Sequence, residues 1–479
     1  MKKITFLIIL IASITNAQTD TRIYDIVKNV KTERIKKDIT KLANFGTRHT
    51  LSDTISDTRG IGAARRWIKS EFEEISKNCG DCLSVQYQKD LVKKNKKRIV
   101  RDVMIVNVVA IQKGSKYPNR YIIMSGDIDS RVSDPNDFSS DSPGANDNAS
   151  GMAGTIEAAR VLSKYTFENS IIYVGLSGEE QGLFGGRGLA KYAKEKGWEI
   201  IGIMNNDMIG NIKGVDGIID NRTFRIFSEP TPITETTKQR NARRFYGGEV
   251  DGISRQLARF IHKTTKTYMP EMNPKMIYRL DRFGRGGHHR PFNDEGFAGI
   301  RIMEMHENYT QQHQDIRNED RIEYGDKLKF VNFDYAKKLT AVNAISLANE
   351  MGIKISESFS KEAGNFLNLI RLTTILLSAA LINGAATAQT VTVADAWVRA
   401  TVAAQRATGA FLKLTVQGAD ATLIAVTSPV AGVTQIHEMA MSEGVMRMRE
   451  VTGGVPLKAG QIFELKPGGY HIMMMDLKQ

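Results

Sequence analysis

Three apolar runs that each end in acidic residues constrain the fold of this chain most strongly. They cover residues 121–130, 171–180 and 201–207, and the acids stand at the carboxyl end of each run. Apolar runs of this length, separated by amphipathic helix patterns, are typical of an α/β fold with a mainly parallel sheet and helices on both faces. Such sheets bind ligands at the carboxyl ends of their strands. We therefore expect a cluster of carboxylates at one edge of the sheet.

The other patterns predict the rest of this α/β domain. Amphipathic helices are expected at residues 61–76, 151–165, 185–196, 250–268 and 333–351, and further strands at residues 103–111 and 298–305. Residues 216–248 are polar and show no clear period. We expect them to form an insertion near the mouth of the active site.

The turn at residues 142–151 carries Asp147 between Gly and Asn residues, just ahead of a predicted helix. An aspartate in such a turn can bridge two metal ions. Oxygen ligands combined with imidazole suit zinc, which activates water when one coordination position stays open. Glu179 and Glu180 offer one metal ligand and one free general base, and His313 follows the last predicted strand. This pattern predicts metal-assisted hydrolysis.

Residues from about 25 to 350 resemble the di-zinc exopeptidases on these motifs. That family includes bacterial leucyl aminopeptidases, the glutamate carboxypeptidase type and, more distantly, glutaminyl cyclases. The resemblance implies the zinc exopeptidase fold, peptide substrates and two Zn²⁺ ions. It also implies a role for each matching residue: Asp147 bridges the ions, Asp127 and Asp207 complete the first site, Glu180 and His313 hold the second, Glu179 is the catalytic base, and Asp129 orients the first ligand.

One position departs from the family pattern. The family usually has His-x-Asp-Ser, whereas this chain has Asp127-Ile-Asp-Ser. An aspartate can ligate zinc, but its added negative charge would weaken the Lewis acidity of the metal, change the metal preference or reduce activity. We expect an aminopeptidase, with dipeptidase or carboxypeptidase activity and an inactive peptide-binding relative as the alternatives.

Two features of residues 282–290 have simpler interpretations than a role in the site. His288 and His289 lie where the family has a substrate-side loop, and we expect them to support the loop or a ligand rather than to bind metal. The arginines of this stretch could bind a substrate carboxylate, but a solvated basic loop is the simpler expectation.

The amino terminus predicts export. Met1, Lys2 and Lys3 precede the apolar residues 4–14, and a small residue, Ala17, follows, as is typical of a secretory signal peptide at residues 1–17. We therefore expect a bacterial protein that is periplasmic or secreted.

The only two cysteines of the chain, Cys79 and Cys82, are spaced C-x-x-C. In an exported protein we expect them to form a local disulfide rather than a reactive thiol pair. The net charge of +13 comes without a recognisable nucleic-acid motif. It therefore predicts a basic surface suited to anionic envelopes or acidic peptides, and no nucleic-acid partner.

The composition changes after the first domain, which we place at residues 18–355. Lysine and asparagine become scarce, and Ala, Val, Thr and Gly take over, which predicts a second domain at residues 389–479. The linker, residues 356–388, contains an uncharged run at 372–388. We interpret this run as an internal signal-peptide-like or membrane-spanning segment, through which the chain could associate with a membrane.

The second domain carries four imidazole and thioether side chains at characteristic spacings: His437, Met448, His471 and Met473. Such ligands select Cu(I) over zinc. With residues 395–400 and 409–412, they resemble the periplasmic copper chaperones. That resemblance implies a cupredoxin-like all-β sandwich, one Cu(I) on these four residues and a copper-accepting protein as partner. The family pattern normally continues beyond residue 479, so we expect an incomplete sandwich. The alternatives are a chain that mainly binds copper, or two genes merged by accident.

Overall fold

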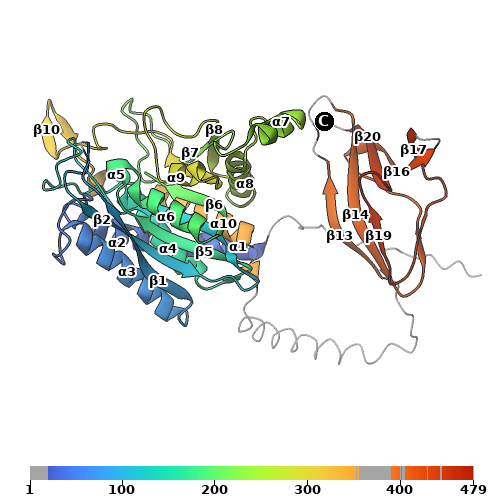
Figure 1. The fold of residues 1–479 in the computed structure, drawn as a ribbon, viewed down its shortest axis with the longest axis horizontal. Coiled ribbons are helices and arrows are strands. Elements are labelled where there is room, and N and C mark those ends of the chain that lie inside the picture. Colours follow the sequence, from blue (N-terminus) through green and yellow to red (C-terminus); the bar gives the residue numbers. More distant parts are fainter. Residues whose placement is uncertain are drawn as a thin grey trace, which may run out of the picture. The chain divides into compact units, whose positions relative to one another are not determined.

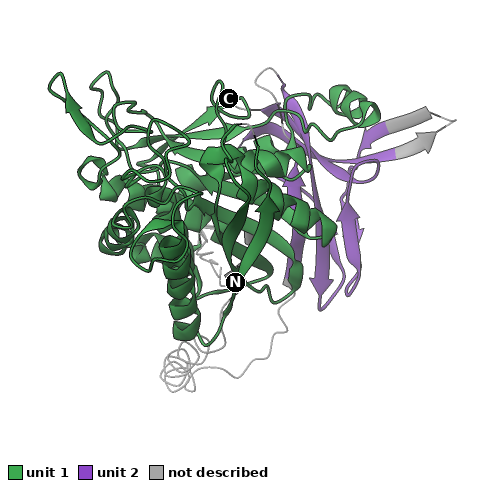
Figure 2. Cartoon of the chain, turned by 60° about the vertical axis from the view of Figure 1, so that its left-hand side comes forward, with its two compact units in different colours: residues 1–364 green, residues 365–479 purple. Residues whose placement is uncertain are grey.

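The computed structural model describes residues 20–95, 97–351, 353–354, 390–399, 401, 405–428, 430–442 and 445–477. The chain divides into two compact units at residues 364 and 365 (Figure 2), which falls within the predicted linker. The predicted signal peptide and the uncharged run at 372–388 lie outside the described residues. Among the helices that are described, none is both long and apolar enough to span a bilayer.

The first unit is built on an eight-stranded sheet in the order β1-β2-β5-β3-β6-β9-β7-β8 (Figure 1). The strands are β1 (Leu83–Val92), β2 (Val103–Gln112), β3 (Tyr117–Asp127), β5 (Asn169–Leu176), β6 (Glu199–Asn206), β7 (Thr223–Ser228), β8 (Asn273–Ile277) and β9 (Gly299–Glu304). Strands β5, β3, β6 and β9 run parallel, as do β7 and β8. The contacts β1–β2, β2–β5 and β7–β9 are antiparallel.

The prediction of a mainly parallel sheet therefore holds for the centre and is wrong toward the edges. Strands β1 and β2 are joined by residues 93–102 alone. So short a connection closes an antiparallel hairpin, because a parallel crossover needs a dozen or more residues.

Helices cover both faces of this sheet, as predicted. One face carries α1 (Thr21–Asn29), α2 (Thr32–Ala43), α3 (Gly60–Asn78), α4 (Ala149–Leu162), α8 (Ile253–Tyr268) and α10 (Phe333–Met351); the other carries α6 (Phe184–Glu195) and α9 (His289–Asp294). Strand side chains alternate between the two layers. In β3, for example, Ile122 and Met124 join the first core, while Tyr121 and Ile123 join the second.

The segment at residues 216–248 differs from its prediction. It contains β7, which lies inside the sheet between β9 and β8, and the helix α7 (Thr237–Phe245). The sequence pattern does not predict this strand, because Arg225 interrupts its apolar residues. Phe224 and Ile226 point into the core, and Arg225 pairs with Glu307 at 3.0 Å.

The predicted disulfide joins Cys79 and Cys82, directly after α3 and before β1. Two small two-stranded sheets complete the first unit. They pair β10 (Arg317–Glu319) with β11 (Ile322–Tyr324), and β4 (Thr166–Phe167) with β12 (Ile353–Lys354). A short helix, α5 (Glu179–Gly182), and a 3-10 turn, η1 (Leu328–Phe330), are the other short elements.

The second unit is all-β. Its main sheet runs in the order β13-β14-β20-β16-β17, with β19 also paired to β14, and β15 pairs with β18. The strands are β13 (Thr390–Val398), β14 (Ala407–Gln417), β15 (Ala421–Leu423), β16 (Ala431–Ser442), β17 (Val445–Glu450), β18 (Val455–Leu457), β19 (Ile462–Leu465) and β20 (His471–Leu477). These described strands pair with one another antiparallel. The all-β prediction is confirmed, while the cupredoxin-like identity stays a prediction.

Candidate metal centre and its cavity

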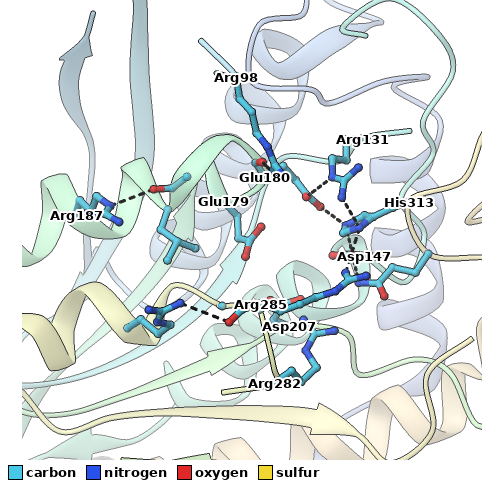
Figure 3. Close-up of a pocket in the computed structure, with 16 residues that line it drawn as sticks. Arg98, Arg131, Asp147, Glu179, Glu180, Arg187, Asp207, Arg282, Arg285 and His313 are labelled. Atoms are coloured by element: carbon cyan, nitrogen blue, oxygen red, sulfur yellow. Dashed lines mark hydrogen bonds and ion pairs between the residues drawn. The ribbon is translucent and has the colours of Figure 1, made fainter. Parts of the chain in front are cut away.

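The acidic side chains gather at one edge of the central sheet, as the sequence predicts. Asp127 ends β3, the Glu179-Glu180 doublet begins α5 directly after β5, and Asp207 follows β6. A cavity of about 460 Å³ opens at this edge. Its wall includes Glu179, Glu180, Asp207, Asp147 and His313 (Figure 3).

Asp147, Glu180 and His313 form a tight, largely buried group. The Nε2 atom of His313 lies 2.8 Å from Oε1 of Glu180 and 3.0 Å from Oδ2 of Asp147. One donor atom from each residue lies within 4.8 Å of the other two. Two carboxylate oxygens and one imidazole nitrogen match the ligand set of a catalytic zinc, which keeps a further position for water. These three residues therefore fit a zinc ion.

Two neighbours hold this group in place. The Nε atom of Arg131 donates to Oε2 of Glu180 at 2.8 Å, and the same guanidinium lies 2.7 Å from Nδ1 of His313. The Asp147 turn is fixed from behind by Asp326, which accepts the backbone N–H groups of residues 146 and 147 at 2.8 and 2.6 Å. Although burial opposes it, hydrogen bonding from His313 keeps the pKa of Asp147 below its ordinary value.

Glycines let the Asp147 turn approach the strand ends closely. A Cβ on Gly126 of β3 would lie 2.5 Å from the backbone of Gly151, and a Cβ on Gly151 would lie 2.2 Å from the carbonyl oxygen of Asn206. Both distances are shorter than real Cβ contacts allow. The start of α4 can therefore sit directly against β3 and β6, which places Asp147 among the strand-end acids.

Asp127 and Asp207 engage other partners. Oδ1 of Asp127 lies 2.5 Å from Nδ1 of His288, and its Oδ2 accepts from the Asn148 amide at 2.7 Å. Oδ2 of Asp207 lies 2.8 Å from the guanidinium of Arg301. His288 and Arg301 are completely buried. The structure thus brings together the predicted ligands of one zinc and pairs the remaining two carboxylates with protein side chains.

Sequence reasoning missed Arg301 and gave His288 only a supporting role. Arg301 occupies a position in β9 where the apolar pattern predicts a core side chain, and its partner Asp207 is 94 positions away. His288 and Asp127 are separated by 161 positions. No local sequence pattern predicts either pair, because both contacts form only when β3, β6, β9 and α9 have packed together.

Glu179 is placed to act as a base. Its carboxyl group reaches into the cavity beside Glu180 and opposite His313 (Figure 3). Burial, and then the neighbouring charges of Glu180 and Asp207, raise the pKa of Glu179 well above its ordinary value. A carboxylate with a raised pKa accepts a proton more readily, which is what a general base requires.

Asp129 supports the Glu179-Glu180 doublet. Its Oδ1 and Oδ2 accept the backbone N–H groups of Glu179 and Glu180 at 3.2 and 3.0 Å. The Thr50 hydroxyl adds a contact to Oδ2 at 3.2 Å. Asp129 therefore fixes the turn that carries the predicted base and one predicted metal ligand. Its predicted role of orienting the first ligand stays a prediction.

The second unit brings its predicted ligands to one face of its sheet. His437 pairs directly with His471 across β16 and β20, with ring centroids 6.0 Å apart. Met473 lies two residues beyond His471, and Met448 pairs with Met439, two residues beyond His437. Paired residues, and residues two apart, share a face. Nδ1 of His471 lies 2.9 Å from the Gly469 carbonyl oxygen, so a proton donated there leaves Nε2 with a free lone pair.

Comparison with known sequences gives a consistent result for the first unit. Residues 107–332 match the model of peptidase family M28. A probable zinc metalloprotease of Pyrenophora tritici-repentis is 39% identical over 334 residues, which is 69% of this chain and 77% of that protein. Residues 391–479 match a second family model, described as lipoprotein LpqE-like.

Two solved structures share the fold of the first unit. The LapA aminopeptidase of Legionella pneumophila is 18% identical, with a TM-score of 0.50 over 70% of this chain and 75% of that chain. A glutaminyl cyclase of Macrostomum lignano is 13% identical, with a TM-score of 0.51 over 71% and 95% of the two chains. At these identities the likeness concerns the fold alone.

Proposed function

Because this chain belongs to peptidase family M28, we propose that its first unit is a zinc-dependent metallopeptidase that removes amino-terminal residues from peptides. One observation carries the proposal. The buried group of Asp147, Glu180 and His313 shares a cavity with Glu179, the carboxyl of raised pKa. Metal ligands and an adjacent free carboxyl group are the parts that metal-assisted amide hydrolysis requires.

Each residue of the site has a separate role in this reaction. Zinc held by Asp147, Glu180 and His313 would supply Lewis acidity to a water molecule and to the scissile carbonyl. Glu179 takes the proton from the attacking water and delivers it to the leaving amine. Asp129 keeps Glu179 and Glu180 at a fixed spacing through their backbone N–H groups. Arg131 holds the carboxylate of Glu180 in orientation.

A second zinc ion forms part of the proposal. Asp127 and Asp207 would hold it, with Asp147 between the two ions. This arrangement requires Asp207 to share its carboxylate with Arg301, and Asp127 to keep His288 as the partner behind it. Metal analysis of the purified chain, before and after dialysis against a chelator, distinguishes two ions per chain from one.

Hydrolysis of short peptides tests the activity. The zinc-loaded chain should cleave peptides with a free amino terminus and leave their acetylated counterparts intact. The variant Glu179→Gln should bind zinc normally and lose turnover. If acetylated peptides are cleaved equally well, the aminopeptidase assignment is wrong. If neither kind is cleaved with zinc, cobalt or manganese, an inactive peptide-binding relative becomes the better interpretation.

We also propose that the protein is exported from a bacterial cell to the periplasm or beyond. The charged and apolar amino-terminal residues support this location, as does the disulfide between Cys79 and Cys82, since disulfides persist in oxidising compartments. Cell fractionation, with the amino-terminal residue of the mature protein determined by sequencing, tests it. Residue 18 is the expected first residue.

For the second unit we propose Cu(I) binding, because one sheet face presents His437, His471, Met448 and Met473 together. Imidazole and thioether ligands favour Cu(I), and a copper-accepting protein would be the natural partner. Titration of the reduced chain with Cu(I) should reveal one site that Met448→Ala and His471→Ala each weaken. Met104→Ala, which removes an exposed methionine of the first unit, is the control. Unchanged affinity in both ligand variants would overturn this proposal.

A further inference from the structure

The wall of the catalytic cavity is dominated by guanidinium groups. Six arginines line it together with the metal-binding acids: Arg98, Arg131, Arg187, Arg282, Arg285 and Arg290. Leu183 is the one apolar side chain among the described residues of this wall. Apolar substrate side chains gain affinity by burial against apolar surface. The cavity therefore offers little to a leucine-like residue.

The six arginines fall into two groups. Arg131 pairs with Glu180, and Arg282 pairs with Glu307 at 2.5 Å. The other four have no carboxylate partner among the described residues. Their guanidinium contacts include backbone carbonyl oxygens, at Glu180 for Arg98 (2.5 Å), at Gly182 for Arg187 (3.1 Å) and at residue 285 for Arg290 (3.4 Å), and the His313 ring for Arg285 (3.3 Å).

Residues 282–290, the arginine loop, are anchored to the metal side of the cavity. Asp281 before it binds Arg301 at 3.1 Å, and His289 at its end lies 2.8 Å from the Leu280 carbonyl oxygen. His288 is tied to Asp127. Between these anchors Gly284 has a positive φ of +65° and a Cβ there would meet open space. The loop can therefore present Arg285 and Arg290 to the cavity on a fixed base (Figure 3 labels Arg285).

Charge balance favours an anionic ligand. Six arginines face four acids in the cavity wall, and bound zinc would neutralise acids further. An enclosed site with excess positive charge concentrates anions. Guanidinium groups bind carboxylates through paired, charge-assisted hydrogen bonds. Arg290 adds a buried Nε–H that has no hydrogen-bond partner among the described residues, and such a donor gains free energy when a ligand satisfies it.

We propose that the preferred substrates are short peptides that place a carboxylate beside the scissile bond, bound by Arg285 and Arg290. This inference rests on the proposed peptidase function. The carboxylate can be the side chain of an amino-terminal Glu or Asp, or the free carboxyl terminus of a dipeptide. Both present the same chemistry to the arginines.

Binding to the full-length, zinc-loaded Glu179→Gln variant tests the inference without turnover. Calorimetric titration compares Glu-Ala-amide with Gln-Ala-amide for the side-chain carboxylate, and Gln-Ala with Gln-Ala-amide for the terminal carboxylate. We expect one of the two acids to bind at least about 10-fold more tightly than its amide partner, since a hydrogen bond to a charged group is worth about that factor. The pair that shows the preference identifies the source of the carboxylate.

Substitutions then assign the effect. Arg285→Met and Arg290→Met, introduced into the Glu179→Gln chain, should each remove most of the preference for the acid. Arg279→Met should keep it, because Arg279 precedes the loop, stacks on Phe283 and does not line the cavity. Equal affinity for acid and amide in both peptide pairs would overturn the inference.

Turnover separates this inference from the function on which it rests. If the unmodified zinc-loaded chain cleaves none of these peptides but the acid preference persists in binding, the peptidase proposal fails and carboxylate recognition stands. If cleavage occurs with Leu-Ala-amide favoured over Glu-Ala-amide, and without preference for a terminal carboxylate, the peptidase proposal stands and the carboxylate inference fails.

Discussion

The two halves of the acidic sheet edge hold their charges in different ways. Asp147, Glu180 and His313 face one another around a common point, with two acids and one imidazole within 4.8 Å. Asp127 and Asp207 each turn to a buried partner instead, His288 in one case and Arg301 in the other. The first half is arranged to receive a cation from solution. The second half has side-chain partners supplied by the chain, and a second zinc ion would have to share its carboxylates with them.

This difference shows how one sheet edge can hold six acidic side chains close together despite their mutual repulsion. Burying an unpaired carboxylate is costly, and either a metal or a paired side chain can remove that cost. The departure at Asp127 fits this account. An aspartate there adds a carboxyl group, and Nδ1 of the buried His288 lies 2.5 Å from its Oδ1, where it provides a hydrogen-bond partner.

The largest effect is expected from removing His313. His313→Ala deletes one of the three close ligands, so we expect loss of tightly bound zinc and a fall in kcat/KM of about 10³-fold, since metal polarisation supplies several kcal/mol of transition-state stabilisation. Metal analysis and peptide kinetics measure the two quantities. His306→Ala, which lies outside the cavity wall, should retain both. A zinc content of His313→Ala equal to that of the original chain would show that His313 holds no metal ion.

Removing Arg301 tests the other half. Arg301→Met leaves Asp207 buried without its guanidinium partner, and breaking such a pair typically costs about 3–5 kcal/mol. We expect the free energy of unfolding of the metal-free protein, measured with urea, to fall by that amount. Arg225→Met is the control, because Glu307 keeps its ion pair with Arg282 when Arg225 is removed, so the loss should cost less. If added zinc fully restores Arg301→Met, Asp207 has a metal as its natural partner.

The sequence predicted which acids gather at the sheet edge, but it did not predict the side chains that pair with them. The reason is physical. Strand ends and the Asp147 turn are encoded locally, by apolar runs and by Gly and Asn residues, so the positions of Asp127, Asp147, Glu180 and Asp207 could be read from short segments. The partners Arg301 and His288 come from β9 and the residues before α9, more than 90 positions from the acids they contact. Such contacts depend on the register of distant strands, which no local pattern contains.

The arginine loop illustrates the same limit. Its composition was consistent with a solvated surface loop, and only its anchors at Asp281, His288 and His289 show that it borders the cavity. The polar segment at 216–248 shows the reverse error. It was expected at the mouth of the active site, yet none of its residues lines the cavity that the structure describes.

Exchanging the Asp127–His288 pair gives a smaller and more specific effect. Asp127→His alone restores the residue usual in the family but places two imidazoles together and deprives the Asn148 amide of one of its two acceptors. We expect a loss of about 1–3 kcal/mol in unfolding free energy, as for an unsatisfied buried polar group. The double variant Asp127→His with His288→Asp should recover part of it. A double-mutant cycle measures this coupling, and a coupling energy near zero would show that the two residues do not act as a pair.

The last effect, small within any one pH unit, concerns Glu304, a buried acid of β9 that lies against neutral partners. Burial raises the pKa of Glu304 to about 8, against hydrogen bonds donated by the backbone N–H of Asn211 at 2.8 Å and the Asn146 amide at 3.0 Å. Its pKa is higher in the folded than in the unfolded protein. The stability it contributes is therefore complete below the ordinary pKa of about 4.5 and is lost as the pH rises through about 8.

Glu304→Gln should remove this dependence. Between pH 5 and 8, each pH unit should lower the unfolding free energy of the original chain by about 1.4 kcal/mol more than that of the variant. Urea unfolding across this range measures the difference in slope, and Glu323→Gln, at a surface acid, should leave the slope unchanged in this interval. Parallel slopes for Glu304→Gln and the original chain would mean that Glu304 stays ionised. Amide and backbone donors alone would then stabilise a buried carboxylate, as an alternative to a metal ion or a charged side chain.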